Sequence, residues 1–498
     1  MGTPKKRTQD EDHEHGRRNP VSAADDHMAE EDEGMGEFED NFVDELEQDD
    51  EGEVIVDNDD DDDDDEDMDA EMENDEEEEE EVRVYLPGDE LKEGEVLVAD
   101  NSAYEMLHQL QVEWPCLSFD ILRDNLGLMR KQFPMTSYIV AGSQAERAKD
   151  NKLYLMKMSD LHRTKHDNDD EMDEDSGDED LDDDPVLEYK TVPHNGGVNR
   201  VRVMPHPESH IVASWSEYGK VHIWDLTQVV ASLDTPGLTA NVTKPLFNVD
   251  RHNKVEGFAM DWSSLGNKYR LLTGDCASKI FLTTLHSNTA FQTDALPFTG
   301  HESSIEDLQW SPAEESVFSS CSADGTIRVW DVRTKGKAQI SWKAHDSDVN
   351  VISWNRLTDR LIASGSDSGE FSVWDLRTVA STAGTKGPQT PAASFNWHKK
   401  PITSIEWHPA ESSMLAVAGA DDQVTLWDLA LERDAEEEPM MAANAAAAGA
   451  PKVEVPPQLL FIHQGQESVK EVHWHPQAPG VLVSTALSGF NVFKTINS

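Results

Sequence analysis

Regularly spaced histidines are the residues of this sequence whose types and positions could do chemistry. Four of them stand 29 or 30 residues before a tryptophan: His194, His301, His345 and His398. The most complete set of accompanying polar groups is His301, Ser320, Asp324 and Trp330. Buried imidazole, hydroxyl, carboxylate and indole groups need hydrogen-bond partners and can supply one another. We therefore expect this set to hold the strands of one structural unit together, and we assign it no catalytic role.

A metal site is the alternative chemistry, offered by His473 and His475 on either side of Trp474. Three other tryptophans hold the same place in earlier repeats (Trp310, Trp354 and Trp407), which favours packing of a core strand over metal binding. The sequence has no P-loop, no GxSxG, no HExxH and no paired-cysteine site. We expect neither an enzyme nor a bound metal or cofactor.

The elements that must position these histidines form a repeat. Four hydrophobic alternations end in Trp-Asp, at His222–Asp225, Ile327–Asp331, Phe371–Asp375 and Val424–Asp428. This period and ending are those of WD repeats, each a four-stranded blade. Degenerate copies open at His252 and His463, and residues 137–142 and 152–157 indicate an earlier blade. The sequence thus predicts an all-β, seven-bladed WD-repeat propeller over residues 114–498, with one blade before residue 190.

Other blades have incomplete polar sets. Tyr218 in the second blade and Ser368 in the fifth stand where an aspartate is expected, and Val417 replaces the hydroxyl of the sixth. We expect these networks to be weaker or to be completed by water.

Acidic residues dominate the charge, with 101 Asp and Glu against 41 Lys and Arg and a net charge of −60. Residues 30–81 and 167–184 contain 34 and 13 acidic residues and no lysine or arginine. Such runs bury too little apolar surface to fold, so both are predicted to be disordered, as are residues 1–29. This charge argues against direct binding to nucleic acid or to an anionic membrane, and for a basic protein partner. The alternative is a solubilising tail.

Shielding of that partner is assigned to carboxylates in both tracts. They include Asp59, Asp60, Asp61, Glu76, Glu77, Glu78, Asp173, Glu174 and Asp175.

Basic clusters near the start, at residues 5–7 and 17–18, form a possible split nuclear-import signal. No signal-peptide core and no run of eighteen apolar residues is present, so neither secretion nor a membrane span is expected. Three widely separated cysteines, Cys116, Cys276 and Cys321, fit a reducing compartment.

Two irregular segments flank the repeats. Residues 100–113 contain Ser102 as a helix cap with Glu105 as its capping-box partner, which predicts a short amphipathic helix packed on the propeller or contacting a partner. An acidic, alanine-rich loop spans 431–457 and is too long for an ordinary connection. Helix and loop together could form a groove for a basic, amphipathic segment. Ring closure is expected from residues 117–122.

Two motifs carry a family resemblance. Residues 112–118, VEWPCLS, and 456–463, PPQLLFIH, resemble the entry motif and proline loop of the retinoblastoma-binding histone-chaperone family. In that family a histone helix lodges between an N-terminal helix and an acidic loop. The resemblance implies a client groove here, formed by Leu107, Leu110, Asp434, Glu436, Glu437 and Glu438.

The long, duplicated acidic tracts are not typical of those histone chaperones. They resemble a sister group, the glutamate-rich WD-repeat proteins of ribosome biogenesis, which act as chaperones of large-subunit ribosomal protein L-three. This resemblance implies a monomer apart from its client, in the nucleus and nucleolus with a cytoplasmic pool. Histone binding in a chromatin complex is the alternative, and a general scaffold is the third possibility.

Overall fold

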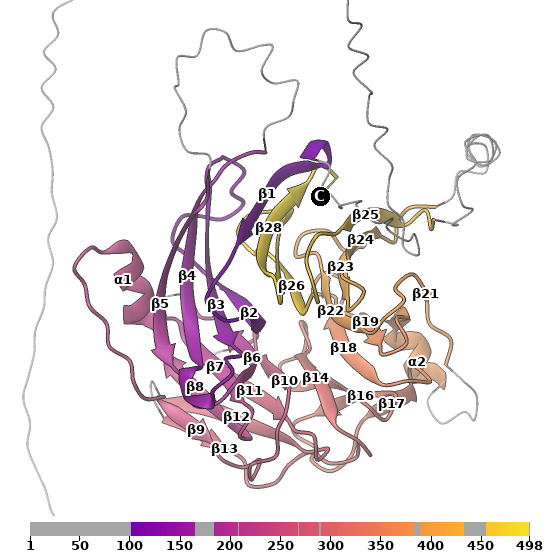
Figure 1. Cartoon of the computed structure of the whole chain (residues 1–498). Coiled ribbons are helices and arrows are strands. Elements are labelled where there is room, and N and C mark those ends of the chain that lie inside the picture. Colours follow the sequence, from indigo (N-terminus) through magenta and orange to yellow (C-terminus); the bar gives the residue numbers. More distant parts are fainter. Residues whose placement is uncertain are drawn as a thin grey trace, which may run out of the picture. The chain divides into compact units, whose positions relative to one another are not determined.

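Seven antiparallel sheets of four strands each are arranged around a common axis (Figure 1). The computed structural model describes residues 101–164, 184–207, 209–266, 268–287, 290–382, 389–432 and 455–497. The predicted seven-bladed all-β propeller is confirmed. Blade one ends at Pro193, and blade seven takes its outermost strand from residues that precede blade one.

Each blade is given from its innermost strand outward. Blade one contains β2 (Cys116–Leu122), β3 (Met135–Ser143), β4 (Lys152–Leu161) and β5 (Val186–Pro193). Blade two contains β6 (Val198–Val203), β7 (Ile211–Ser216), β8 (Lys220–Asp225) and β9 (Phe247–Val249). Blade three contains β10 (Ala259–Trp262), β11 (Arg270–Gly274), β12 (Ile280–Ser287) and β13 (Ala290–Thr293). Blade four contains β14 (Ile305–Trp310), β15 (Val317–Ser322), β16 (Thr326–Asp331) and β17 (Ile340–Lys343).

The remaining blades follow the same order. Blade five contains β18 (Val349–Trp354), β19 (Leu361–Ser366), β20 (Phe371–Asp375) and β21 (Ala393–Phe395). Blade six contains β22 (Ile402–Trp407), β23 (Met414–Gly419), β24 (Val424–Asp428) and β25 (Leu459–His463). Blade seven contains β26 (Glu471–Trp474), β27 (Val481–Ala486), β28 (Gly489–Thr495) and, outermost, β1 (Tyr104–Leu110).

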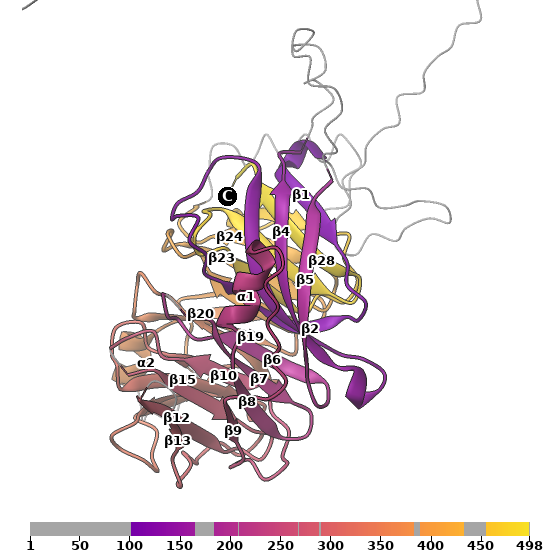
Figure 2. The ribbon, with the colours of Figure 1, turned by 90° about the vertical axis from the view of Figure 1, so that its left-hand side faces the viewer.

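Two short helices lie outside the sheets, α1 (Thr227–Asp234) after β8 and α2 (Leu376–Thr382) after β20. Figure 2 shows α1 beside the outer strands of blade one. Its last residue, Asp234, accepts hydrogen bonds from Tyr138 of β3 at 2.7 Å and from Lys157 of β4 at 2.9 Å. The helix therefore ties blade two to blade one.

The prediction of a helix over residues 100–113 is wrong, because most of this segment is a strand. After a 3-10 turn at Asn101–Ala103, the chain enters β1, which pairs antiparallel with β28 from Tyr104↔Thr495 to Leu110↔Phe490. A free edge on β28 offers a full ladder of hydrogen bonds, and pairing there buries Tyr104, Met106 and Leu110. Glu105 bonds Lys494 and Arg163 rather than serving a capping box.

Ring closure is therefore made by β1 and not by residues 117–122, which lie in β2, the innermost strand of blade one. Tyr104 secures the closure, because its hydroxyl bonds Nδ1 of the buried His463 at 2.7 Å. His463 belongs to β25 of blade six, so β1 holds blades six and seven together.

The polar set of blade four is joined as a network within one blade. His301 Nδ1 lies 2.9 Å from Asp324, its Nε2 lies 2.7 Å from Ser320 Oγ, and Trp330 Nε1 donates to the same hydroxyl at 2.8 Å. In blade two, His194 Nδ1 lies 2.8 Å from the carbonyl oxygen of Gly196, which takes the place of the missing aspartate.

Blade six corrects the expectation that its network is weak or completed by water. Thr425 lies directly across the β23–β24 ladder from Val417, the position where the hydroxyl was missing. Its Oγ1 lies 3.0 Å from His398 Nε2 and accepts from Trp427 Nε1 at 2.7 Å. Because cross-strand neighbours share one face of the sheet, a hydroxyl from either strand can fill the same place.

A second series of hydrogen bonds joins five of the seven pairs of neighbouring blades. In each pair, a side chain on the innermost strand of one blade accepts a hydrogen bond from a backbone N–H on the innermost strand of the following blade. The accepting residue directly precedes the repeated tryptophan, or holds the equivalent position in a blade without it. The pairs are Asp120 with Val203 (2.7 Å), Asp261 with Trp310 (2.7 Å), Gln309 with Trp354 (2.7 Å), Ser353 with Trp407 (3.2 Å) and Glu406 with Trp474 (3.0 Å). All of these residues lie near the ends of innermost strands, so these strands run in the same direction around the ring.

Candidate binding face

One face of the propeller is defined by the ends of the seven innermost strands, and we call it the channel-mouth face. Strands within a blade alternate in direction, so the third strand of each blade also ends there and the fourth begins there. Residues 165–183 connect β4 to β5, residues 433–454 connect β24 to β25, and the first hundred residues lead to β1. All three connections therefore join this one face, at the consecutive blades six, seven and one.

The predicted acidic residues belong to these three connections. Asp59, Asp60, Asp61, Glu76, Glu77, Glu78, Asp173, Glu174, Asp175, Asp434, Glu436, Glu437 and Glu438 all lie outside the described residues. The structure places the residues that precede or follow each of these connections.

The apolar half of the predicted client groove is placed differently from the expectation. Leu110 is 5% exposed and packs in the core between blades seven and one, beside Phe490. Leu107 is half-buried and packs against the core cluster that contains Tyr104 and Phe493. Neither side chain presents the face of a helix to a partner, because both belong to the strand that closes the ring.

The outer edge of β1 is covered by the end of the β4 segment. Thr164 N–H donates to the carbonyl oxygen of Glu105 at 3.1 Å, and Leu107 N–H donates to Thr164 Oγ1 at 2.9 Å. His108 Nε2 lies 2.8 Å from the carbonyl oxygen of His162. Thr164 is the last described residue before the connection that carries the second acidic tract, so the chain reaches this connection beside blade seven.

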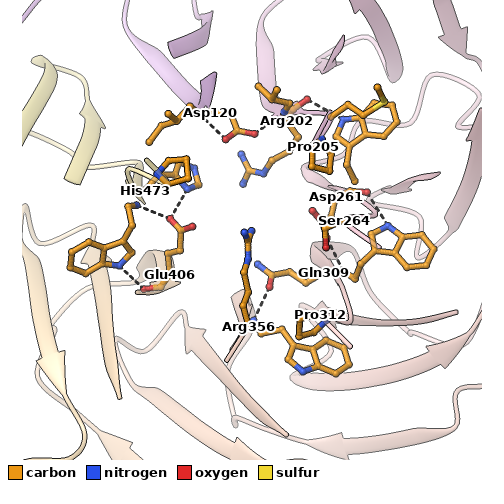
Figure 3. A pocket seen from close by; sticks show the side chains of 18 of the residues that line it. Asp120, Arg202, Pro205, Asp261, Ser264, Gln309, Pro312, Arg356, Glu406 and His473 are labelled. Carbon is orange, nitrogen blue, oxygen red and sulfur yellow. Dashed lines mark hydrogen bonds and ion pairs between the residues drawn. The ribbon is translucent and has the colours of Figure 1, made fainter. Parts of the chain in front are cut away.

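A cavity of about 220 Å³ opens among the ends of the innermost strands (Figure 3). Charged side chains from several blades face it, including Asp120, Arg202, Asp261, Arg356 and Glu406. These charged side chains around the cavity were not predicted from the sequence, although the polar residue before each repeated tryptophan was a visible signal.

Glu471 is the most constrained charge beside this cavity. It is 1% exposed, bonds Arg200 and Arg202 of blade two at 2.7 Å each, and accepts from Phe119 N–H of blade one at 2.8 Å. Burial opposes its ionisation, but Arg202, His473 and Arg200 outweigh burial and hold its pKa well below the ordinary value. A carboxylate of blade seven thus joins blades one and two.

His473 lies in the same cluster, between two carboxylates. Burial disfavours its protonation, yet Glu406 at 2.9 Å and Glu471 at 3.6 Å raise its pKa to about 10. Asp261 shows the opposite balance, since burial raises its pKa to about 7 against the N–H of Trp310. Within the described ranges, no cluster of three or more metal-ligating side chains occurs.

The seven four-stranded blades and their Trp-Asp endings define the class of protein, a WD-repeat propeller. Residues 293–331, 336–375 and 389–428 match the model for "WD domain, G-beta repeat". Residues 94–162 match the model for "Histone-binding protein RBBP4", which also covers the equivalent component of the CAF1 complex. The second match contains the ring-closing strand.

Similar proteins specify the family. The chain is 47% identical to ribosome assembly protein rrb1 of Schizosaccharomyces pombe, over 93% of each chain. It is 46% identical to glutamate-rich WD repeat-containing protein 1 of Dictyostelium discoideum, over 82% of this chain and 84% of that one. It is 47% identical to protein HEAT STRESS TOLERANT DWD 1 of Arabidopsis thaliana, over 83% and 92%. The chain belongs to the glutamate-rich WD repeat protein 1/Rrb1 family, which is non-enzymatic and related to the RBBP4 histone-binding proteins.

Two further properties concern the described part of the chain. None of its helices is long and apolar enough to cross a membrane. Its three cysteines, Cys116, Cys276 and Cys321, are free thiols.

Proposed function

We propose that this protein is a ribosome biogenesis factor that shields a newly made basic ribosomal protein and delivers it to large-subunit assembly. The observation that carries the proposal is the attachment of all three acidic connections to the channel-mouth face at consecutive blades. The name of the rrb1 relative, a ribosome assembly protein, supports it. Large-subunit ribosomal protein L-three is the client that we propose, in the nucleus and nucleolus with a cytoplasmic pool.

The mechanism follows from the chemistry of such a client. A protein built to bind RNA phosphates carries lysine and arginine side chains that bind other polyanions when RNA is absent. Exposed ion pairs contribute only ~0–1 kcal/mol each. Many weak pairs held at one face still retain the client, because tethering raises the effective concentration of carboxylates. RNA then releases the client by offering a denser array of phosphates.

The test is deletion of residues 30–81 followed by measurement of L-three affinity across a salt series. We expect weaker binding and a smaller dependence on salt, since fewer ion pairs form. A control chain in which the same 52 positions are replaced by a Gly/Ser linker of equal length separates charge from length. Equal affinity and an equal salt slope in all three proteins would refute the shielding role.

Binding of core histones is a second candidate, favoured by the match of residues 94–162 to the histone-binding family. Affinity purification at moderate salt with nuclease present distinguishes the two. Recovery of one dominant ribosomal protein supports the first proposal, and recovery of core histones supports the second. Reversal of Glu436, Glu437 and Glu438 to lysine tests whether the loop between β24 and β25 takes part in either.

A further inference from the structure

The loop between β2 and β3 exposes three apolar side chains together. Leu126, Leu128 and Met129 are 56%, 74% and 61% exposed. In the described ranges, no other run of four positions contains three exposed large apolar side chains. Clustered exposed apolar groups mark interaction sites, whereas single ones are ordinary. We call these three residues the apolar knob.

The knob stands on a fixed base. Arg130 donates two hydrogen bonds to the carboxylate of Asp124, from Nη1 to Oδ1 at 2.9 Å and from Nη2 to Oδ2 at 2.8 Å. Gln477 of blade seven, 3% exposed, bonds the backbone of the loop at Asp124 N–H (2.9 Å), at the Asp124 carbonyl (2.9 Å) and at the Gly127 carbonyl (3.1 Å). A loop held at both ends loses little conformational entropy when it binds, so the knob is preorganised.

The loop backbone has two residues in the left-handed region. Gly127 has φ +107° and Met129 has φ +57°, both in the left-handed region. That conformation is unfavourable for Met129. The next residue, Arg130, is held in place because its N–H donates to the Gln477 carbonyl oxygen at 2.9 Å. Met129 thus combines a left-handed backbone conformation with a side chain that is 61% exposed.

The knob lies on the channel-mouth face, because its loop begins where β2 ends. It belongs to blade one and is tied to blade seven, two of the three blades to which the acidic connections are joined. The knob and the points where the acidic connections join the fold therefore share one face of the propeller.

The charges beside the knob limit what it can contact. Arg123 and Lys131 flank it and are exposed, while Arg130 is paired with Asp124. Two exposed cations repel a lysine- or arginine-rich segment, so an apolar stretch of the client fits here better than a basic one. The basic segments of the client would instead bind the acidic connections.

We propose, resting on the function proposed above, that the apolar knob is the docking site for an apolar segment of the basic client. The knob supplies contact that does not depend on salt, and the acidic connections supply attraction that does. Selectivity among basic proteins then comes from the knob, because a polyanion alone accepts any of them.

The test uses the full-length protein and purified L-three. Leu128→Ser is compared with Leu296→Ser, a matched control that is 69% exposed in the connection from blade three to blade four. Because that connection follows an outermost strand, it lies on the opposite face. We expect Leu128→Ser to weaken client binding several-fold. The triple change of Leu126, Leu128 and Met129 to serine should weaken it at least tenfold, with the salt slope unchanged.

Each outcome decides a separate question. If wild-type protein binds L-three and the triple variant binds it equally well, the knob is not the docking site and the shielding function stands. If wild-type protein does not bind L-three, the proposed function fails. If the triple variant loses self-association in sedimentation and keeps its client affinity, the knob binds a second copy of this chain and the inference is overturned. A melting temperature equal to wild type excludes misfolding.

Discussion

Replacement of Glu471 by glutamine should destabilise the propeller far more than the same replacement at an exposed ion pair. Glutamine keeps an oxygen that can accept the Phe119 N–H, but it removes the charge between Arg200 and Arg202. Breaking a buried pair costs ~3–5 kcal/mol. The two arginine side chains are 15% and 17% exposed, so water relieves part of this and we expect about 3 kcal/mol.

Glu113→Gln is the matched control. Glu113 bonds Lys152 at 2.7 Å, the same distance as Glu471 to Arg202, but its side chain is 59% exposed rather than 1%. An exposed pair is worth ~0–1 kcal/mol. Urea unfolding of both variants at neutral pH, followed by tryptophan fluorescence, gives the two losses side by side.

The pH dependence provides an independent check on the cause. The pKa of Glu471 is lowered on folding, so its stabilisation is complete above its ordinary pKa and is lost as pH falls toward the folded-state value. The difference between wild type and Glu471→Gln should therefore shrink in acid. Equal losses in Glu471→Gln and Glu113→Gln, or a difference that grows in acid, would refute the role assigned to this carboxylate.

Three further changes test other parts of the fold. Thr425→Val removes the hydroxyl shared by His398 and Trp427 and should cost ~1–3 kcal/mol in urea unfolding, with Thr425→Ser as the control. Asp261→Asn should gain stability relative to wild type as pH rises from about 5 to about 8. Burial raises the pKa of Asp261 on folding, so ionisation of this carboxyl group destabilises the native state of the wild type. Melting temperatures of both proteins at the two pH values measure the difference. Tyr104→Phe removes the bond to His463 and should speed amide exchange in β1 without changing that of blade four.

The blades could be predicted from the sequence because each blade repeats the same short-range pattern of residues. A period, a histidine and a Trp-Asp ending are enough to locate strands whose partners lie within about thirty residues. Thr425 was missed because the hydroxyl position was read along one strand, whereas the network needs only an oxygen on that face of the ladder.

The N-terminal helix was the error with the greatest consequence. Ser102 and Glu105 carry a local signal for a helix start, and local signals are weaker than tertiary pairing. The strand that β1 pairs with begins at Gly489, so nothing near residue 104 in the sequence reveals the free edge that it fills. Leu107 and Leu110 accordingly belong to the core and its border, and the exposed apolar side chains of this region lie on the β2–β3 loop.

The closing ladder also sets an order of events during synthesis. Tyr104 is translated 391 positions before its partner Thr495. At ~5–20 residues per second, β1 waits roughly 20 to 80 seconds for β28 to be made. The acidic residues before β1 are translated before the propeller ring can close. The nascent chain therefore carries their negative charge before its fold is complete. A chain that stops short of β28 leaves both β1 and the edge of β27 without their partner strand, and such unpaired edges are templates for aggregation.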